Sequence, residues 1–419
     1  MFKTIANAWK IPEIRQKILF TLLMLLIYRI GAFIPVPGVN VEHIANIVGQ
    51  YDVLGFLNLM SGDSLSRMTI FALGIVPYIN ASIIMNLLTV AIPKLERMAK
   101  EGDDGRKKIA SITRYLGVTL GLIQAIGIML SMGPDAVENT SWFTYFTIVV
   151  CLTAGTALIM WIGERITEKG IGNGISLLIF ISIIAGVPGM VINIWNAAMA
   201  PTGTFWSIIL VTAIAFVIVL GITFVDLGER RIPVQYAKRV VGRKMYGGQS
   251  THIPMKVNQS GVMPLIFAIT ILMFPGMIAQ FFPDSGFYAG YTQYFGQGTV
   301  VYGIVYALLI LFFSYFYSQI AFNPVDVSKN LQQNGGFIPG IRPGKPTSDY
   351  LAKILSRITL FGALFLAIVA AVPNFFNFAT GVPAVFGATS LLIMVSVALE
   401  TTKQLESQMM MRHYKGFLN

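Results

Sequence analysis

The chain alternates between long apolar runs and short polar connections. Ten runs are long and apolar enough to cross about 30 Å of hydrocarbon as helices. They lie at residues 18–36, 71–92, 115–133, 143–163, 174–195, 205–225, 258–282, 299–322, 354–373 and 380–399. The pattern predicts an all-α integral membrane protein with ten spans.

Composition agrees with this pattern, because 55% of the 419 residues are hydrophobic and only 12% are charged. Such a balance excludes the two or three soluble domains that the length alone would suggest. The first run starts near Ile18 and lacks a small-residue cleavage site, so we expect a retained span and no removable signal peptide.

Basic residues are confined to alternate connections. Of the 30 Lys and Arg residues, 28 lie on one side of the alternation, and only Arg29 and Arg67 lie elsewhere. The positive-inside rule places that side, with both termini, in the cytoplasm. The basic segments are those before residue 18, after residue 400, and at 93–114, 164–170, 226–257 and 323–357.

Ten spans divide into two sets of five, and since five is odd, the second set starts on the opposite side of the membrane. We therefore expect residues 1–195 and 196–400 to form two inverted halves, followed by a cytoplasmic tail at 401–419. Folds of this kind bind or pass their substrate near the midplane, between the halves.

The spans carry almost no charge, whereas ion-coupled transporters and proton pumps need titratable groups along their path. Arg29 is the exception, and its side chain can snorkel to an interface. The interiors carry amides instead, whose plainest role is hydrogen bonding between helices. These are Asn80, Asn86, Gln124, Gln280 and Gln319.

The second span contains Gly74, Pro77 and Asn80 where a lipid-facing helix would carry leucine, which indicates that it faces protein or water. Isoleucines recur every four residues in this span and in the fifth, so each set shares one helix face. Taken alone, such a stripe is more often core or lipid-facing than functional. The isoleucines are Ile75, Ile79 and Ile83, and then Ile179 and Ile183.

The connection between the first two spans is moderately apolar but interrupted at Ser61 and Gly62, so it is too broken to cross the membrane. Two structures fit it: an external loop with a short surface helix, or a re-entrant segment enclosed by protein or by a water-filled cavity.

Two cytoplasmic connections are too long to be simple linkers. The first, at 226–257, alternates polar and apolar residues around Gly242, Arg243 and Lys244, which predicts a strand-turn-strand hairpin with a basic tip. The second, at 323–353, is rich in Gly and Pro and carries Arg342 between turn residues. These charges suit either membrane topology or docking to phosphate backbones and acidic protein surfaces.

Motifs for catalysis and cofactor binding are missing, so we expect neither an enzyme nor a cofactor. The sequence has no HExxH, no P-loop and no intramembrane Asp pair, and its one cysteine, Cys151, provides no disulfide framework or thiolate metal site. GIGNG at 170–174 has the wrong spacing for a dinucleotide site and predicts a helix-entry turn capped around Asn173 or Ser176.

Four stretches resemble the SecY family of bacterial protein-translocation channel subunits. The most specific are GIVPYINASIIMNLL in the second span and WIGERITEKGIGNGISLLIF leading into the fifth. They are joined by NPVDVSKNLQQNGGFIPGIRPG and STHIPMKVNQSGVMPLIFA, and the resemblance extends from about Arg15 to beyond the tenth span. One departure is Asn86, where the family usually has Gln, a mild change.

The resemblance implies a funnel-shaped channel between two pseudo-symmetric five-helix halves, narrowed at mid-membrane by isoleucines and closed outside by a short plug helix. The implied ring includes Ile79, Ile83, Ile183, Ile266 and Ile393, with Ile75 and Ile179 at its edge. The implied plug, at about residues 55–67, contains Gly55, Phe56, Leu57, Leu59, Met60, Ser61, Gly62, Leu65 and Arg67.

A lateral gate is also implied between the second span and spans seven and eight, with Asn80 facing Phe274 and Gln124 nearby. The resemblance further implies that basic side chains dock the motor ATPase SecA or the ribosome, including its rRNA. These side chains are Arg243, Lys244 and Arg342.

The function implied is translocation of unfolded secretory proteins across the bacterial cytoplasmic membrane, with lateral release of hydrophobic segments into the bilayer. SecE and SecG are the implied partner subunits. Ten spans with an inverted repeat also fit a secondary transporter for a neutral or amphipathic solute, but the spans offer no coupling charge. An intramembrane enzyme would need a nucleophile-base or carboxylate pair, which we do not find.

Overall fold

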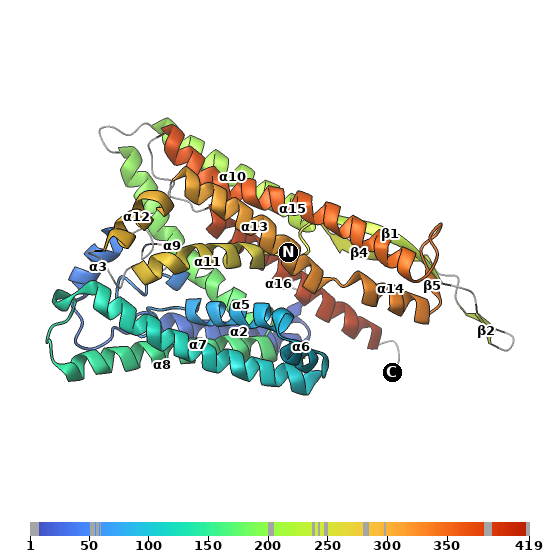
Figure 1. Cartoon of the computed structure of the whole chain (residues 1–419), viewed down its shortest axis with the longest axis horizontal. Coiled ribbons are helices and arrows are strands. Elements are labelled where there is room, and N and C mark those ends of the chain that lie inside the picture. Colours follow the sequence, from blue (N-terminus) through green and yellow to red (C-terminus); the bar gives the residue numbers. More distant parts are fainter. Residues whose placement is uncertain are drawn as a thin grey trace. The chain divides into compact units, whose positions relative to one another are not determined.

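The computed structural model describes the chain except for residues 1–7, 51–54, 56–57, 59, 200–204, 237–238, 242–243, 247–249, 280–284, 297–298, 381–387 and 416–419. Most of its elements are helices (Figure 1). They form two compact units. Unit 1 consists of Met1–Ile208, Thr270–Tyr302 and Val397–Asn419, and unit 2 of Ile209–Ile269 and Gly303–Ser396.

Each of the ten predicted spans overlaps one helix. In chain order these are α2 (Pro12–Gly31), α5 (Val76–Ala91), α7 (Asp103–Met132), α8 (Trp142–Lys169), α9 (Gly174–Met199), α10 (Phe205–Leu227), α11 (Met263–Ala279), α13 (Val300–Ala321), α15 (Lys345–Thr380) and α16 (Ala388–Lys415). The shorter helices are α3 (Val41–Gln50), α6 (Pro93–Lys100), η1 (Pro134–Ala136), α12 (Gly286–Phe295) and α14 (Pro324–Gln333).

Within the described part of the chain, four segments are long and apolar enough to cross a membrane, or five if the bent pair α5 and α6 is one span. The four are Asp103–Leu130, Trp142–Lys169, Val300–Gln333 and Lys345–Val372. The number of ten spans therefore stays a prediction.

The chain bends by 100° between α5 and α6. Ile92 precedes Pro93 and is extended, at φ −106° and ψ 113°, because a proline disfavours the helical conformation of the residue before it. On the exposed surface of α6, Lys100 donates a hydrogen bond to Glu96, and this lowers the pKa of the Glu96 carboxyl. The bend ends the second predicted span.

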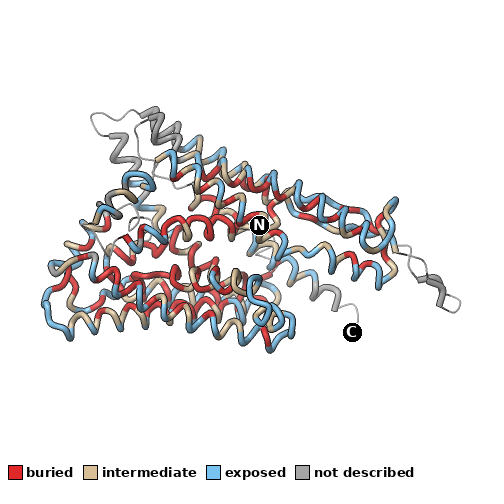
Figure 2. The backbone as a smooth tube through the Cα atoms, in the orientation of Figure 1, coloured by how far each residue is buried: buried red, intermediate tan, exposed pale blue. Residues whose placement is uncertain are grey.

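Glycines allow helices of unit 1 to approach closely. A Cβ atom on Gly155 of α8 would lie 1.7 Å from the carbonyl oxygen of Ile70, and one on Gly174 would lie 1.9 Å from that of Gly163. Figure 2 shows buried and exposed residues alternating along α7 and α8, so each helix has one packed face and one open face. Close backbone contact of this kind is typical of helix packing in membranes.

The turn that leads into α9 is capped as the sequence predicts. The Asn173 side-chain oxygen accepts hydrogen bonds from the backbone N–H groups of Ile175 and Ser176, at 3.1 and 3.4 Å. Gly172 has φ +84°, a conformation that glycine adopts without strain. The prediction of a helix-entry turn at GIGNG is therefore confirmed.

The two long connections of unit 2 join in one antiparallel sheet with strand order β4-β1-β5. The strands are β1 (Glu229–Tyr236), β4 (Ser250–Lys256) and β5 (Gly336–Phe337), and Ile232 of β1 pairs with Ile253 of β4. Beyond them, β2 (Arg239–Val241) pairs with β3 (Lys244–Tyr246). The predicted hairpin is confirmed, whereas the participation of the second connection, through β5, was not predicted.

We expect Gly155→Ala to destabilise the protein, because the new methyl group would collide with backbone at Ile70. Overpacking of this kind costs about 1 to 3 kcal/mol, which lowers the midpoint of thermal unfolding of the purified protein in detergent. Gly303→Ala in α13 is the control, since a Cβ there meets no atom within 4 Å. Equal midpoints for the two variants would contradict the close approach.

Candidate functional site

The isoleucines of α5 and α9 that were singled out by spacing are all buried. Ile75, which caps α5, and the others are each 5% or less exposed. By contrast, Ile84 and Ile184, one position along from two of them, are 36% exposed. The rows therefore face protein, although burial alone fits both a packed core and a closed pore. The buried members are Ile75, Ile79, Ile83, Ile179 and Ile183.

The two implied ring members of unit 2 are buried as well. Ile266 lies in the first turn of α11 and is 5% exposed, and Ile393 lies on α16 and is 3% exposed. Each isoleucine is thus placed on a protein-facing side within its own unit, and the ring itself stays a prediction.

The segment before α5 is held by short-range hydrogen bonds. Asn58 donates to the Asp63 carboxylate at 3.0 Å and accepts from the backbone N–H of Ser66 at 2.8 Å. Ser64 donates to the Ser61 carbonyl at 2.8 Å. Ser61, Ser64 and Leu65 are buried, whereas Arg67 is exposed. This segment is a compact turn, with its polar side chains folded back on its own backbone.

Of the implied plug residues, Gly55, Met60 and Ser61 are helical, and Gly62 is a buried turn residue. Phe56, Leu57 and Leu59 lie outside the described residues. The segment is buried in unit 1, which fits a re-entrant segment better than a short helix exposed on the surface. Its role as a plug is untested by the geometry.

Two arginines lie over the same aromatic ring near this segment. The guanidinium carbons of Arg29 and Arg67 are 5.3 and 4.8 Å from the Phe33 ring centroid. Among the described residues, one buried nitrogen of Arg29, Nη1, has no hydrogen-bond partner. The aromatic face of Phe33 stabilises the Arg29 cation within the apolar first span.

The implied gate residues lie on α5, α7 and α11. Asn80 and Gln124 belong to helices that pack against each other, and each has a buried side-chain atom without a hydrogen-bond partner in the described part of the chain. Phe274 is 50% exposed. Buried amides are normally satisfied, so these two need a partner or water in the working protein. The gate stays a prediction.

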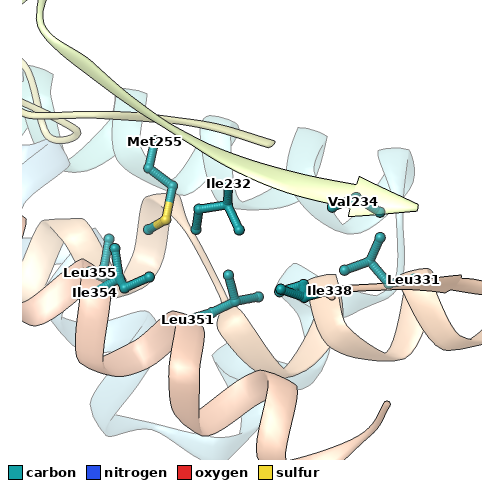
Figure 3. Packing of buried hydrophobic residues seen from close by; sticks show 8 residues of the cluster. All are labelled: Ile232, Val234, Met255, Leu331, Ile338, Leu351, Ile354 and Leu355. Carbon is teal, nitrogen blue, oxygen red and sulfur yellow. The ribbon is translucent and has the colours of Figure 1, made fainter. Parts of the chain in front are cut away.

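The two long connections of unit 2 share one hydrophobic core with α14 and α15. Figure 3 shows side chains of β1 and β4 pointing toward those of α15. On β1, Ile232 and Val234 are buried and alternate with exposed residues, as expected for a strand with one covered face. The cluster consists of Ile232, Val234, Met255, Leu331, Ile338, Leu351, Ile354 and Leu355.

This core supports the loop that carries Arg342. The Arg342 side chain is exposed, and its carbonyl oxygen accepts a hydrogen bond from the Thr347 hydroxyl at 2.8 Å. Ser328 of α14 donates to the Gly344 carbonyl at 2.7 Å. Lys244 lies on β3, and Arg243 lies outside the described residues. The loop therefore presents an exposed guanidinium on a backbone held by hydrogen bonds.

Helix α14 was missed, because the second connection was interpreted as a turn-rich loop. Its signal is Asn323 followed by Pro324 and Asp326. The Asn323 side chain accepts from the Val325 N–H at 3.0 Å and donates to the Asp326 carboxylate at 2.8 Å. An Asn cap with proline in the first turn is a sequence-level helix start.

Among the described residues, no three His, Cys, Asp or Glu side chains come together as a metal site. The described residues provide buried apolar helix faces, a compact turn before α5 and an exposed basic loop.

Known proteins are similar in sequence to this chain over its full length. A family model of SecY matches residues 69–402. Proteins named protein translocase subunit SecY are 46% identical in Halalkalibacterium halodurans, 45% in Streptomyces galbus and 42% in Mycobacterium bovis, each aligned over 100% of both chains.

Solved channel structures share the fold. One of them, a protein-conducting channel, aligns with 94% of this chain over 92% of its own length, with a TM-score of 0.66 at 20% identity. Sec61 in the canine ribosome-channel complex covers the same shares, with a TM-score of 0.62 at 18% identity.

The helical fold is the one found in protein-conducting channels of known structure. The full-length similarity is more specific. The chain belongs to the SecY family of multi-pass proteins of the cell membrane.

We expect Leu351→Ala to loosen the sheet of β4, β1 and β5, because Leu351 is fully buried in the shared core. Removing such a side chain costs about 2 to 5 kcal/mol. Hydrogen exchange of β1 and β4 amides, measured by mass spectrometry, should accelerate accordingly. Tyr350→Ala, at the exposed neighbouring position, is the control. Unchanged protection in Leu351→Ala would show that the sheet does not depend on α15.

Proposed function

We propose that this chain is the channel subunit of a protein translocase. It conducts unfolded secretory polypeptides across the cell membrane and releases hydrophobic segments sideways into the bilayer. The observation that carries this function is full-length similarity to translocase subunits, and it favours a channel over a transporter of small solutes. The protein is a conduit and not an enzyme.

We propose that the buried isoleucines line the narrow part of the channel. A passage for any unfolded chain must block ions without holding a charged or polar side chain back. A ring of branched apolar side chains meets both demands, because a hydrophobic constriction excludes ions by dewetting. Ile79 and Ile83 on α5 and Ile183 on α9 are the unit 1 members, and Ile266 and Ile393 come from unit 2.

The segment at 55–67 is the plug of this channel in our proposal. Its support is the turn around Ser61 and Gly62, which is buried and is held by hydrogen bonds within the segment itself. The turn ends before α5 begins. When the plug leaves, the apolar ring alone seals around the passing chain.

The lateral gate sorts segments by free energy. Near the middle of a membrane helix, residues such as Leu favour the bilayer by roughly 0.3 to 0.6 kcal/mol, whereas Asp, Lys or Arg cost about 2.5 to 3.5 kcal/mol. About 20 apolar residues therefore leave sideways, and a polar stretch continues through. Asn80, Gln124 and Phe274 are the gate residues that we propose.

We propose ten spans in two inverted halves, with both termini and the basic connections in the cytoplasm. The support is the overlap of each predicted span with one helix and the confinement of Lys and Arg to alternate connections.

The driving force comes from partners, because the sequence has no nucleotide-binding P-loop. We propose SecA and the translating ribosome as those partners, with SecE and SecG as further subunits. Structural neighbours include the canine Sec61 channel and the yeast Ssh1 complex, each bound to a ribosome. Arg342 and Lys244 lie on the sheet-supported connections where such partners would dock.

Cysteine crosslinking to a stalled secretory chain tests the channel and the ring together. In a Cys151→Ser background, Ile183→Cys should form an adduct with the stalled chain, because the thiol faces the passage. Ile159→Cys on α8 is the matched control, since Ile159 is equally buried but outside the ring. In proteoliposomes, passage should require SecA and ATP. Equal adducts at both positions would defeat the ring assignment, and solute uptake without chain passage would defeat the function.

Reversing the charge of Arg342 tests the docking role. Arg342→Glu should abolish SecA-driven transport in proteoliposomes while leaving membrane insertion of the channel intact, because it turns an attractive contact with an acidic surface into a repulsive one. Lys345→Glu provides the control, since Lys345 is exposed nearby in the same connection. Normal transport by the Arg342→Glu variant would contradict docking and leave this arginine with the alternative role of setting the membrane topology.

A further inference from the structure

The chain that leaves α2 and the segment before α5 are joined by a short backbone bridge. Pro35 pairs with Thr69 in an antiparallel β-bridge. Next to it, the Val36 N–H donates a hydrogen bond to the Met68 carbonyl oxygen at 2.9 Å. These contacts fix the backbone around Arg67 beside the chain that follows α2.

Two cations share one exposed aromatic ring at this place. Phe33 is 56% exposed, and the guanidinium carbons of Arg29 and Arg67 lie 5.3 and 4.8 Å from its ring centroid. Laid end to end, these distances put the two carbons at most about 10 Å apart, close to the screening length at physiological salt. Like charges at this range repel. Among the described residues, neither arginine forms a salt bridge with a carboxylate.

The same two arginines are the ones that the charge pattern of the sequence leaves unexplained. The positive-inside rule accounts for the other 28 Lys and Arg residues and not for this pair. A cation is favourable at a helix C-terminus, which gives a reason for Arg29 in the last turn of α2. Arg67 has no such reason, since it is exposed and lies in a turn. The pair therefore calls for a source of negative charge.

An apolar strip along α2 leads up to these cations. Large apolar side chains that are 41 to 56% exposed recur every three or four residues, so they lie along one face of the helix. A strip of this kind that ends at basic side chains fits a phospholipid, whose acyl chains contact the strip while its phosphate meets the cations. The side chains are Leu19, Leu22, Leu23, Leu26, Ile27 and Ile30.

We infer that Arg29 and Arg67 form a binding site for the phosphate of an anionic phospholipid. Guanidinium groups donate paired hydrogen bonds to phosphate oxygens, and a phosphate between them relieves their mutual repulsion. A zwitterionic lipid fits less well, because its own ammonium group would be repelled by the same arginines. In the proposed topology, this end of α2 lies in the outer leaflet.

The Arg29 side chain is already oriented for this role. Its Nη1 atom is buried, and it lies 3.1 Å from the position that a Cβ atom on Gly62 would take. The rest of the side chain is only partly buried. One edge of the guanidinium is therefore fixed against the protein, and binding a phosphate costs little loss of side-chain freedom.

Photolabelling of the complete channel complex in proteoliposomes tests the site. The probe is phosphatidylglycerol with a diazirine high in one acyl chain, diluted in phosphatidylcholine, and labelled residues are mapped by mass spectrometry. Label should appear at Ile30, Phe33 and Ile34. Arg67→Gln should lower it about tenfold, as expected for the loss of one charged hydrogen bond, and Arg29→Gln should do the same. Arg67→Lys keeps the charge and should retain most of the label.

Arg15→Gln is the matched control, since Arg15 is an exposed arginine at the opposite end of α2, and it should leave the label at Ile30 and Ile34 unchanged. Phosphatidylcholine with the same diazirine should label these positions less. Equal labelling by the two probes, or full labelling of Arg67→Gln, would show annular lipid only and overturn the site. Absence of label from the complete complex would overturn it too, because another subunit would then cover the strip.

Added inorganic phosphate distinguishes a lipid headgroup from a free anion. At matched ionic strength, phosphate and chloride should lower the label equally, because both only screen the charges. Selective competition by phosphate would assign the two arginines to a free anion and overturn the lipid site. The measurement needs no protein transport, so its result does not depend on the proposed function.

Discussion

Close backbone contact at glycine is the interaction on which unit 1 depends. Lipid tails are as apolar as leucine side chains, so burying leucine between helices gains little, and packing with a few polar links must hold the helices together. Gly155 and Gly174 allow carbonyl groups of neighbouring segments to approach where any side chain would collide. Gly62 does the same between the proposed plug segment and α9. Close contact at glycine therefore packs the helices and also seats this segment.

The helices were predictable because membrane spans need long apolar runs, and the cap at Asn173 was predictable because its side chain acts on its own helix. Tertiary contacts were not. The turn before α5 is held by serine and asparagine side chains whose partners depend on the fold, and the hydrogen bond between the Tyr28 and Ser182 hydroxyls joins positions 154 residues apart. A two-residue strand such as β5 has too short a pattern to identify, because its pairing with β1 creates it.

The candidate site was predictable to a similar degree. Spacing alone placed Ile79, Ile83 and Ile183 on shared helix faces, and their burial agrees with that. Spacing does not distinguish a core from a closed passage, because both are apolar and buried, and only the family resemblance singled out Ile266 and Ile393. In unit 2, the patterns of soluble proteins apply instead. The alternation of polar and apolar residues along β1 predicted a strand, and the apolar side of this strand packs against α15.

A closed channel must be sealed firmly and opened by a passing chain, and these demands limit how strongly the proposed plug segment can be held. A neutral hydrogen bond contributes about 0.5 to 1.5 kcal/mol, and measured bonds between membrane helices average near 0.6. The bonds around Ser61 lie within the turn and fix its shape. The close contact of Gly62 with α9 seats the turn among the helices of unit 1. Buried ion pairs at this turn would hold it too strongly, because separating charges away from water costs several kcal/mol.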